Sequence, residues 1–331
     1  MEQAQSVFIK LAEKIMMPNS RIIPELFAML VSEQDAQILL ALPGTAEELA
    51  QKFSMDRQAM QKKLDELFLK GVAFKNKRPE GTRYKMVREV VQFHDATILW
   101  PDAPQAYYDA WQRFMETEWP DFAKIVGQML PKPVTRIIPV EKALSPRAQI
   151  LSHESCSEVI DKSAVLAVTK CTCRLIAHKC SSPIEVCIQE GKAAQYAIER
   201  GTGRQISKEE AREIIRKAEE AGLVHVTMNR SKDFHYICNC CGCCCIAMPV
   251  MIQHGARMVD PSRYLAEVDT SACTACGTCV DRCWFSALSM DGEKAVVDAE
   301  KCLGCGVCQV TCPTSAISLV QVRGEDFIPA A

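Results

Sequence analysis

Apolar positions recur at helical spacing in three stretches near the start of the chain. Residues 34–42 are apolar on one face, and Pro43-Gly44 ends the pattern. Thr45 can cap a second helix, since Glu48 three residues later completes the spacing of a capping box. Residues 56–70 form the third stretch. Its apolar positions share one face: Met60, Leu64, Leu67 and Phe68. The pattern predicts three short helices in succession.

Two strand-like segments follow the third helix. Residues 72–74 and 83–87 are joined by a polar loop through Pro79-Glu80-Gly81, which predicts a two-stranded wing. This order of elements resembles the winged-helix regulators of the MarR type. The resemblance implies a winged-helix-like domain, with an N-terminal helix, over residues 1–100, and such proteins often form homodimers.

The net charge of residues 1–100 helps to decide whether the predicted winged helix binds DNA. Residues 1–100 hold 14 basic and 13 acidic residues, a net charge of +1, whereas phosphate binding usually needs a basic stripe. The bases gather mainly on the predicted wing. We therefore expect a docking or structural role, and DNA binding stays open as the alternative. That alternative would use Arg57, Lys62, Lys75, Lys77, Arg78 and Arg83.

Residues 101–262 mix helical and strand patterns. An amphipathic helix over 104–130 is interrupted at Pro120, and branched residues predict strands. The expected strands are 134–140 and 164–168. Ser207 and Glu210 have the spacing of a capping box for a helix over 209–221. The pattern predicts a mixed α/β central domain in a multidomain α+β chain.

Composition is ordinary except in cysteine. Of 331 residues, 24% are charged and 48% hydrophobic, while 19 are cysteine. No secretory signal or apolar stretch of membrane-spanning length is visible, so we expect a cytoplasmic protein without a membrane partner. Cysteines in a reducing compartment are more often metal ligands than disulfides.

Eight cysteines form two C-x2-C-x2-C-x3-C runs near the end of the chain. The runs are Cys273, Cys276, Cys279, Cys283 and Cys302, Cys305, Cys308, Cys312, offset by 29 residues. Three thiolates at this spacing can surround one corner of a cubane, and the fourth can reach a neighbouring cluster. Four-cysteine zinc sites typically use paired C-x2-4-C rather than the C-x2-C-x2-C triplets of these two runs, so zinc is disfavoured at the runs. The repeat predicts two similar half-domains.

These runs resemble the bacterial two-[4Fe-4S] ferredoxins, and the resemblance covers residues 263–331. It implies crossed ligation of two clusters. Cluster 1 would use Cys273, Cys276, Cys279 and Cys312, and cluster 2 would use Cys302, Cys305, Cys308 and Cys283. Pro313 follows the second run as in that family, but Trp284 stands where the first run would have proline. The substitution puts the local turn and the environment of the cluster in doubt.

Ten further cysteines lie in the central domain, apart from Cys156, which we expect to be simply buried. A strand runs into Cys171-Thr172-Cys173-Arg174, and a second segment, C-N-C-C-G-C-C-C, occupies 238–245. The first places thiolates at a sheet end, where the second can close over them. The six cysteines of 238–245 cannot all bind one cluster because adjacent side chains point in different directions. The candidate ligands are Cys171, Cys173, Cys180 and Cys187, followed by Cys238, Cys240 and Cys241.

We expect at least one further iron–sulfur cluster at these central cysteines. Zinc, a redox-active thiol pair and structural thiols remain alternatives. Arg174 could donate a hydrogen bond to a cluster sulfur or be an ordinary surface arginine. Residues 134–320 also resemble a family of 4Fe-4S dicluster proteins of anaerobic bacteria, which adds no specific reaction.

Electron transfer is the leading functional hypothesis, as an oxidoreductase component or adaptor rather than a self-contained enzyme. The sequence contains no glycine-rich dinucleotide fingerprint or Walker motif, so we expect no nucleotide or flavin. Residues 264–331 hold nine acids and four bases, which favours docking of a basic redox partner protein. Two alternatives stay open: a redox-sensing or Fe–S-sensing DNA-binding regulator, and a reductase whose central cluster binds substrate.

Overall fold

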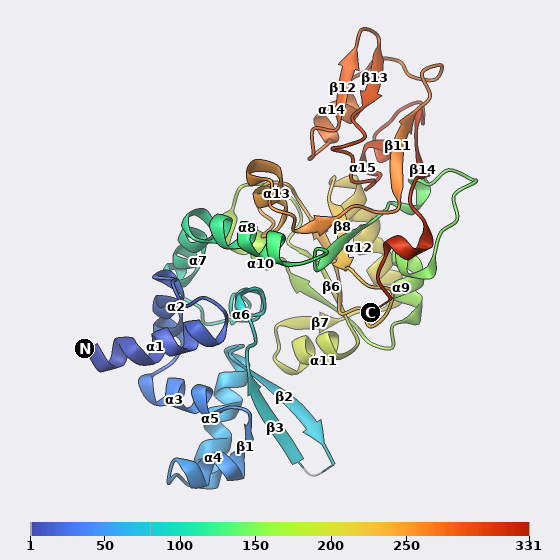
Figure 1. Cartoon of the computed structure of the whole chain (residues 1–331). Coiled ribbons are helices and arrows are strands. Elements are labelled where there is room, and N and C mark those ends of the chain that lie inside the picture. Colours follow the sequence, from blue (N-terminus) through green and yellow to red (C-terminus); the bar gives the residue numbers. More distant parts are fainter. Residues whose placement is uncertain (1, 80, 331) are drawn as a thin grey trace. The chain divides into compact units, whose positions relative to one another are not determined.

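The computed structural model describes residues 2–79 and 81–330 and divides into two compact units, Met1–Trp119 and Pro120–Ala331 (Figure 1). We call these the N-terminal and C-terminal units and describe each by itself. Glu80, in the predicted wing loop, lies outside the described residues, as do Met1 and Ala331. In the described part of the chain, no helix has both the length and the apolar character needed to cross a membrane.

The N-terminal unit consists of helices around a small sheet. Its helices are α1 (Glu2–Lys14), α2 (Ile22–Leu30), α3 (Glu33–Ala41), α4 (Ala46–Lys52), α5 (Arg57–Leu69), α6 (Val90–Thr97) and α7 (Gln105–Thr117). Its strands are β1 (Gly44–Thr45), β2 (Ala73–Arg78) and β3 (Gly81–Met86), in the order β1-β3-β2. The predicted wing strands are present, but the sheet has a third strand, because β1 pairs with β3.

Local capping explains where these helices begin. Thr45 and Glu48 form the predicted capping box of α4, with each side chain bonded to the other residue's backbone N–H. Asp56 caps α5 by accepting hydrogen bonds from two backbone N–H groups. The four predicted apolar residues of α5 are all buried. The predicted helices are thus confirmed, whereas their classification as a winged helix stays a prediction.

The C-terminal unit is built on a seven-stranded sheet in the order β10-β4-β8-β9-β6-β5-β7. The strands are β4 (Thr135–Ile138), β5 (Leu166–Lys170), β6 (Glu185–Glu190), β7 (Gly203–Gln205), β8 (Val224–Met228), β9 (Tyr236–Cys240) and β10 (Val259–Asp260). All neighbouring pairs are antiparallel except β10 and β4. Thus β6, with β5 on one side and β9 on the other, brings together two cysteine-bearing segments that lie far apart in the sequence.

Helices and short 3-10 turns accompany this sheet. The helices are α8 (Trp119–Met129), α9 (Cys156–Lys162), α10 (Thr172–Ala177), α11 (Gly191–Glu199), α12 (Lys208–Glu220) and α13 (Met248–His254); the turns are η1 (Glu141–Ala143) and η2 (Ser152–Glu154). The predicted helix over 104–130 is interrupted, but at Glu118 between α7 and α8 rather than at Pro120, which lies in the first turn of α8. Cys156 is buried as expected, and burial raises the pKa of its thiol well above its usual value.

Two details of this unit differ from the sequence predictions. Ser207 caps α12, but the predicted capping box does not close, because the Glu210 carboxylate pairs with Arg204 at 2.6 Å instead. The strand expected over 164–168 is β5 and lies slightly later, at Leu166–Lys170. In the first case the Arg204 side chain on β7 competes with the local signal.

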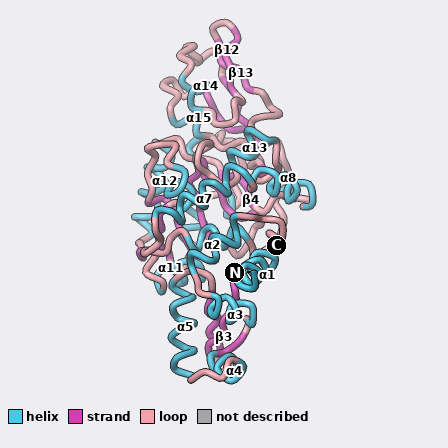
Figure 2. Tube along the Cα trace, turned by 90° about the vertical axis from the view of Figure 1, so that its left-hand side faces the viewer, coloured by secondary structure: helices cyan, strands magenta, loops and turns pink. Residues whose placement is uncertain are grey.

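The last part of the C-terminal unit holds the two cysteine runs. Its elements are β11 (Tyr264–Val268), α14 (Thr278–Arg282), β12 (Leu288–Asp291), β13 (Lys294–Val297), α15 (Val307–Val310), β14 (Ile317–Gln321) and η3 (Glu325–Phe327). β11 pairs with β14, and β12 pairs with β13, each antiparallel. The β12–β13 hairpin lies at the end of this unit far from the seven-stranded sheet (Figures 1 and 2).

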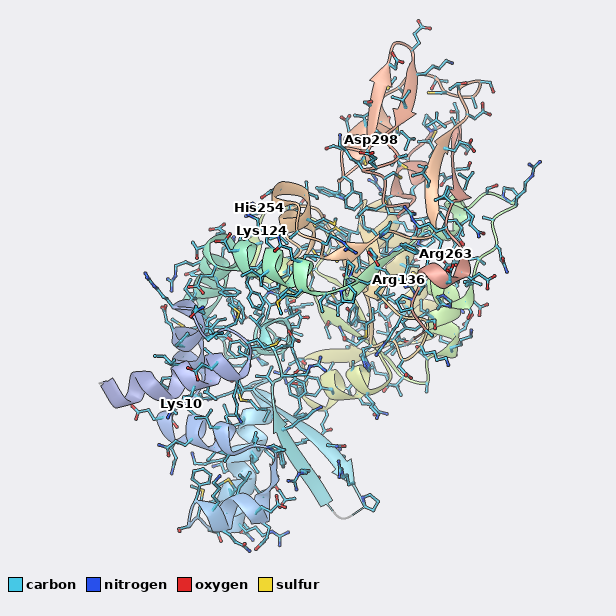
Figure 3. The ribbon with its side chains drawn as sticks, in the orientation of Figure 1. Lys10, Lys124, Arg136, His254, Arg263 and Asp298 are labelled. Atoms are coloured by element: carbon cyan, nitrogen blue, oxygen red, sulfur yellow. The ribbon has the colours of Figure 1, made fainter. Side chains whose placement is uncertain are left out.

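A buried ion pair joins this last part to the sheet domain. Arg263, labelled in Figure 3, stands immediately before β11 and contacts the Glu154 carboxylate at 2.7 Å, with both side chains buried. The Arg263 guanidinium also donates to the carbonyl of Gln149 at 2.9 Å. Because breaking a buried pair leaves an uncompensated charge, this contact holds the entry to β11 in place.

Candidate metal centres

The eight cysteines of the repeated runs gather around two separate cavities. The first cavity is lined by Cys273, Cys276, Cys279 and Cys312; the second is lined by Cys302, Cys305, Cys308 and Cys283. We call these cysteine sets the outer quartet and the inner quartet. In each set, three thiols come from one run and the fourth from the other. This is the grouping that crossed ligation requires, although the assignment of these thiolates as ligands stays a prediction.

The repeat sets the geometry of both cavities. The backbone N–H of Cys273 donates to the Asp269 carbonyl at 3.0 Å, and that of Cys302 donates to the Asp298 carbonyl at 3.0 Å. The fourth cysteine of each run accepts a backbone N–H: Ala287 donates to Cys283 Sγ at 3.3 Å and Ala316 donates to Cys312 Sγ at 3.2 Å. Such N–H donors stabilise thiolate sulfur, so the residues present fit iron–sulfur clusters.

The two quartets differ in exposure. Cys276 of the outer quartet is exposed, and the hydroxyl and backbone N–H of Thr278 lower the pKa of its thiol. In the inner quartet Cys302 and Cys308 are buried, and burial raises the pKa of Cys305 to about 12. The same ligand pattern is therefore placed once at the surface and once in a less solvated setting.

Trp284, where the ferredoxins would have proline, packs against the central domain. A Cβ added to Gly242 would lie 2.6 Å from the Trp284 ring, so only glycine permits this approach. The indole N–H donates to the Gly222 carbonyl at 2.7 Å. Next to it, Arg282 donates to the Glu220 carbonyl at the end of α12 at 2.7 Å. The change from proline thus anchors the turn beside Cys283 on the loop that carries the central cysteines.

Six central cysteines form a closed ring in which each thiol interacts with two others. Around the ring the order is Cys171, Cys173, Cys245, Cys240, Cys238 and Cys187, and Cys187 interacts with Cys171 in turn. We call this set the six-thiol ring. Cys171 stands just before α10 and just after β5, at the N-cap position. Cys187 lies on β6, opposite Thr169 of β5.

The other members of the ring come from β9 and the loop after it. Cys238 and Cys240 are two residues apart on β9, so their side chains leave the same face of the strand. The intervening Asn239 is buried and bonds to His225 at 2.6 Å. Cys245 accepts a backbone N–H from Ala247 at 3.4 Å. The second cysteine segment therefore closes over the sheet end, as predicted.

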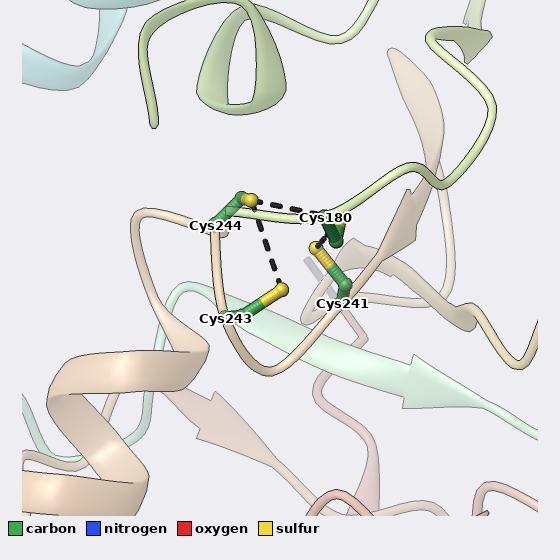
Figure 4. Close-up of side chains that lie close together, drawn as sticks. All are labelled: Cys180, Cys241, Cys243 and Cys244. Carbon is green, nitrogen blue, oxygen red and sulfur yellow. Dashed lines mark hydrogen bonds between the residues drawn. The ribbon is translucent and has the colours of Figure 1, made fainter. Parts of the chain in front are cut away.

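The remaining four central cysteines form a compact set, which we call the central quartet (Figure 4). Its members are Cys180, Cys241, Cys243 and Cys244, and their sulfur atoms all lie within 4.8 Å of one another. Cys180 Sγ lies 3.7 Å from Cys244 Sγ and 3.9 Å from Cys241 Sγ, and Cys243 Sγ lies 3.7 Å from Cys244 Sγ. Four thiols this close can hold a further metal centre.

Arg174 lies between the two central groups and is buried, not a surface arginine. Its guanidinium donates to Cys241 Sγ at 3.5 Å and to the Asn239 carbonyl at 2.9 Å. A hydrogen bond with Cys244, together with this guanidinium, holds the pKa of Cys241 below its usual value. Hydrogen bonds from Cys173 and Cys187 likewise lower the pKa of Cys171, with Arg174 adding a favourable charge.

The structure divides the predicted central ligands between two places. Cys180 and Cys241 belong to the central quartet, whereas the other five predicted cysteines belong to the six-thiol ring. Sequence reasoning omitted Cys243, Cys244 and Cys245. Their signal was the break at Gly242, where the alternating C-N-C of a strand gives way to a tight cysteine loop.

Comparison with known protein families gives a match for one region of the chain. Residues 272–316 match the family model of the 4Fe-4S dicluster domain, so this segment is a domain that binds two [4Fe-4S] clusters. Neither a curated protein nor a solved structure matches the chain. A dicluster domain of this type implies iron–sulfur electron transfer.

Proposed function

We propose that this protein is an iron–sulfur electron-transfer component that connects a redox partner protein to a metal-binding central domain. The dicluster domain supports iron–sulfur electron transfer, and the central cysteines supply thiols for at least one further centre. The three parts that we propose are a docking domain over 1–100, a central domain over 101–262 and a dicluster domain over 263–331.

The outer and inner quartets would hold the two clusters of the dicluster domain. A bound [4Fe-4S] cluster supplies reversible one-electron chemistry. The chain contributes the thiolates, the N–H donors from Ala287 and Ala316, and the difference in exposure between the quartets. Exposure and hydrogen bonding both tune reduction potential, so the chain can give its two clusters unlike potentials.

The outer quartet, which contains the exposed Cys276, is the side at which a redox partner would approach. Cys276 is exposed, so a partner can come close to this ligand set. Nine acids against four bases over residues 264–331 favour a basic docking surface on that partner. Such steering weakens as ionic strength rises.

The single observation that carries the proposal is the contact between the inner quartet and the central domain. Cys305 of this quartet accepts the backbone N–H of Val140 through its carbonyl at 2.9 Å. Trp284, next to Cys283, packs on Gly242 between two cysteines of the central quartet. These contacts favour exchange of electrons between the dicluster domain and a central centre, as in an oxidoreductase component or adaptor.

For the N-terminal unit we propose a winged-helix docking or structural role rather than DNA binding. Three of the six candidate DNA-binding bases are paired with acids of the same unit. The pairs are Arg57–Glu47 at 3.3 Å, Lys75–Asp65 at 3.0 Å and Arg83–Glu48 at 3.0 Å. Pairing reduces the positive potential that phosphate binding requires.

The proposal is tested on protein purified without oxygen. Iron and acid-labile sulfide are counted per chain, and the reduced protein is examined by EPR during a redox titration. We expect about eight iron and eight sulfide from the dicluster domain and more from the central domain. Reversible reduction of the iron–sulfur clusters by an external electron donor supports electron transfer. Centres that do not change oxidation state across the accessible range of potentials would rule it out.

A further inference from the structure

The ten central cysteines form two thiol groups of different geometry, and we propose that these are two metal centres of different kind. The central quartet holds a single tetrahedral metal ion, for which its four thiolates favour zinc. The six-thiol ring holds the central iron–sulfur cluster. The second half of this proposal rests on the proposed function, whereas the first half does not.

Sulfur spacing in the central quartet matches one ion. A zinc–sulfur bond of about 2.3 Å at tetrahedral angles places the sulfurs about 3.8 Å apart. Three of the six sulfur pairs lie at 3.7, 3.7 and 3.9 Å. The remaining three pairs also lie within 4.8 Å, so all four sulfurs can surround one point.

The dicluster domain provides an internal comparison for a cubane. In a cubane each thiolate binds a separate iron corner, so the four sulfurs must lie farther apart than around one ion. Across residues 2–79 and 81–330, the central quartet is the one group of three or more metal-ligating side chains whose ligand atoms all lie within 4.8 Å. The outer and inner quartets do not meet this limit. They surround cavities instead.

The six-thiol ring has the more open arrangement. Each thiol interacts with its two neighbours, but no three of the six have all their sulfur atoms within 4.8 Å of one another. The six sulfurs therefore surround a larger space than a single ion occupies. Its six thiols exceed the four that one cubane needs. The ring can therefore surround several irons, whereas the central quartet can surround one ion.

The segment 238–245 carries cysteines of both proposed centres, so a single ion at the central quartet would also stabilise the position of this segment. Cys238 and Cys240 face the ring from β9, and Cys241, Cys243 and Cys244 then turn to the central quartet. Only Cys180 reaches that quartet from outside this loop. An ion there would pin the loop to the segment after α10 and hold Cys245 over the ring.

Charge is consistent with an ion at the central quartet. A divalent ion with four thiolates keeps a formal charge of about −2. Arg174 is buried and donates to Cys241 Sγ at 3.5 Å, so part of that charge is compensated inside the protein.

Matched double variants separate the two centres. Cys243→Ser with Cys244→Ser changes the central quartet, and Cys238→Ser with Cys240→Ser changes the ring; both pairs lie on the same short segment. Zinc, iron and acid-labile sulfide are measured per chain on oxygen-free protein. The first variant should lose about one metal ion per chain and no sulfide. The second should lose iron and sulfide together and keep the single ion.

The outcomes are distinct. Loss of one zinc, or of one iron without sulfide, from the first variant supports the single-ion centre. Loss of sulfide with that variant overturns it, as does unchanged metal content. If neither variant affects sulfide, the ring has no cluster, and the dicluster EPR signals still report separately on the proposed electron transfer.

Cobalt provides a test that does not depend on how well a variant folds. The wild-type chain is produced with cobalt in place of zinc, and its visible absorption is recorded. About one cobalt per chain, with the absorption of a tetrahedral tetrathiolate, supports the proposal. Absence of that absorption while the dicluster signals are intact overturns it.

Discussion

The eight cysteines of the dicluster domain and the ten of the central domain reach their groupings by different routes. In the dicluster domain, a 29-residue repeat fixes which thiols meet, because each run folds locally and lends one cysteine to the other. In the central domain, pairing of β5, β6 and β9 decides the grouping, and cysteines adjacent in sequence go to different thiol groups. The spacing of cysteines in the sequence therefore predicts which thiols group together only where short sequence segments, rather than strand pairing, set the grouping.

The surroundings of the two regions also differ. Dicluster sulfurs accept hydrogen bonds from backbone N–H groups such as Ala287 and Ala316. Central sulfurs depend more on one buried cation, Arg174, and on one another. A single side-chain substitution should therefore disturb the central domain more than it disturbs cluster ligation in the dicluster domain, unless it removes a ligand.

Loss of a ligand in the dicluster domain gives the largest expected effect. Cys312→Ser should remove the same cluster as Cys273→Ser, with loss of about four iron and four sulfide, because both line the outer cavity. Cys283→Ser should instead match Cys302→Ser. EPR of the four reduced variants identifies the surviving cluster. If Cys283→Ser matches Cys273→Ser, ligation is not crossed.

Removal of the buried cation comes next. Arg174→Gln should weaken metal binding at the central quartet by about 10- to 100-fold, because Cys241 loses its charged hydrogen-bond donor. Competition with a chelator measures the change. Arg204→Gln is the control, since Arg204 is exposed and pairs with Glu210 away from the thiols. Equal effects of the two substitutions would contradict a special role for Arg174.

Truncation of Trp284 tests the contact between the two regions. Trp284→Ala should lower the free energy of unfolding by about 2 kcal/mol, below the range for fully buried aromatic residues because Trp284 is only partly buried. Denaturant unfolding without oxygen measures this. Ile252→Ala, at a side chain 40% exposed on α13, should have little effect. Iron content should stay unchanged in both variants, and loss of a cluster from Trp284→Ala would show that the residue acts on ligation.

The smallest expected effect concerns reduction potential. Thr278 donates through Oγ1 to Cys276 Sγ at 3.5 Å, so Thr278→Ala should make the potential of the outer cluster more negative. Thr314→Ala should change it less, because Thr314 Oγ1 lies 3.8 Å from Cys312 Sγ. An EPR-monitored redox titration resolves the two clusters. A larger shift from Thr314→Ala would contradict this ranking of the hydrogen bonds.

Much of the local structure could be predicted from the sequence. The capping box at Thr45 and the buried face of α5 follow from side-chain type and helical period. The box at Ser207 failed because Arg204, close in space, takes the Glu210 carboxylate. Grouping of the central thiols could not be predicted, since it depends on which strands are neighbours. The sequence Cys171-Thr172-Cys173-Arg174 likewise gave no sign that the Arg174 side chain would be buried.

The approach of the Trp284 ring to Gly242 has a consequence for the evolution of this chain. Ferredoxin-type domains are often regarded as modules that can be exchanged between proteins. Here a bulky indole occupies space that a glycine leaves open, and its N–H donates to Gly222. A transplanted ferredoxin with proline at this position would leave that space unfilled. We therefore expect a change at Trp284 or Gly242 to be tolerated only with a matching change on the other side of this contact.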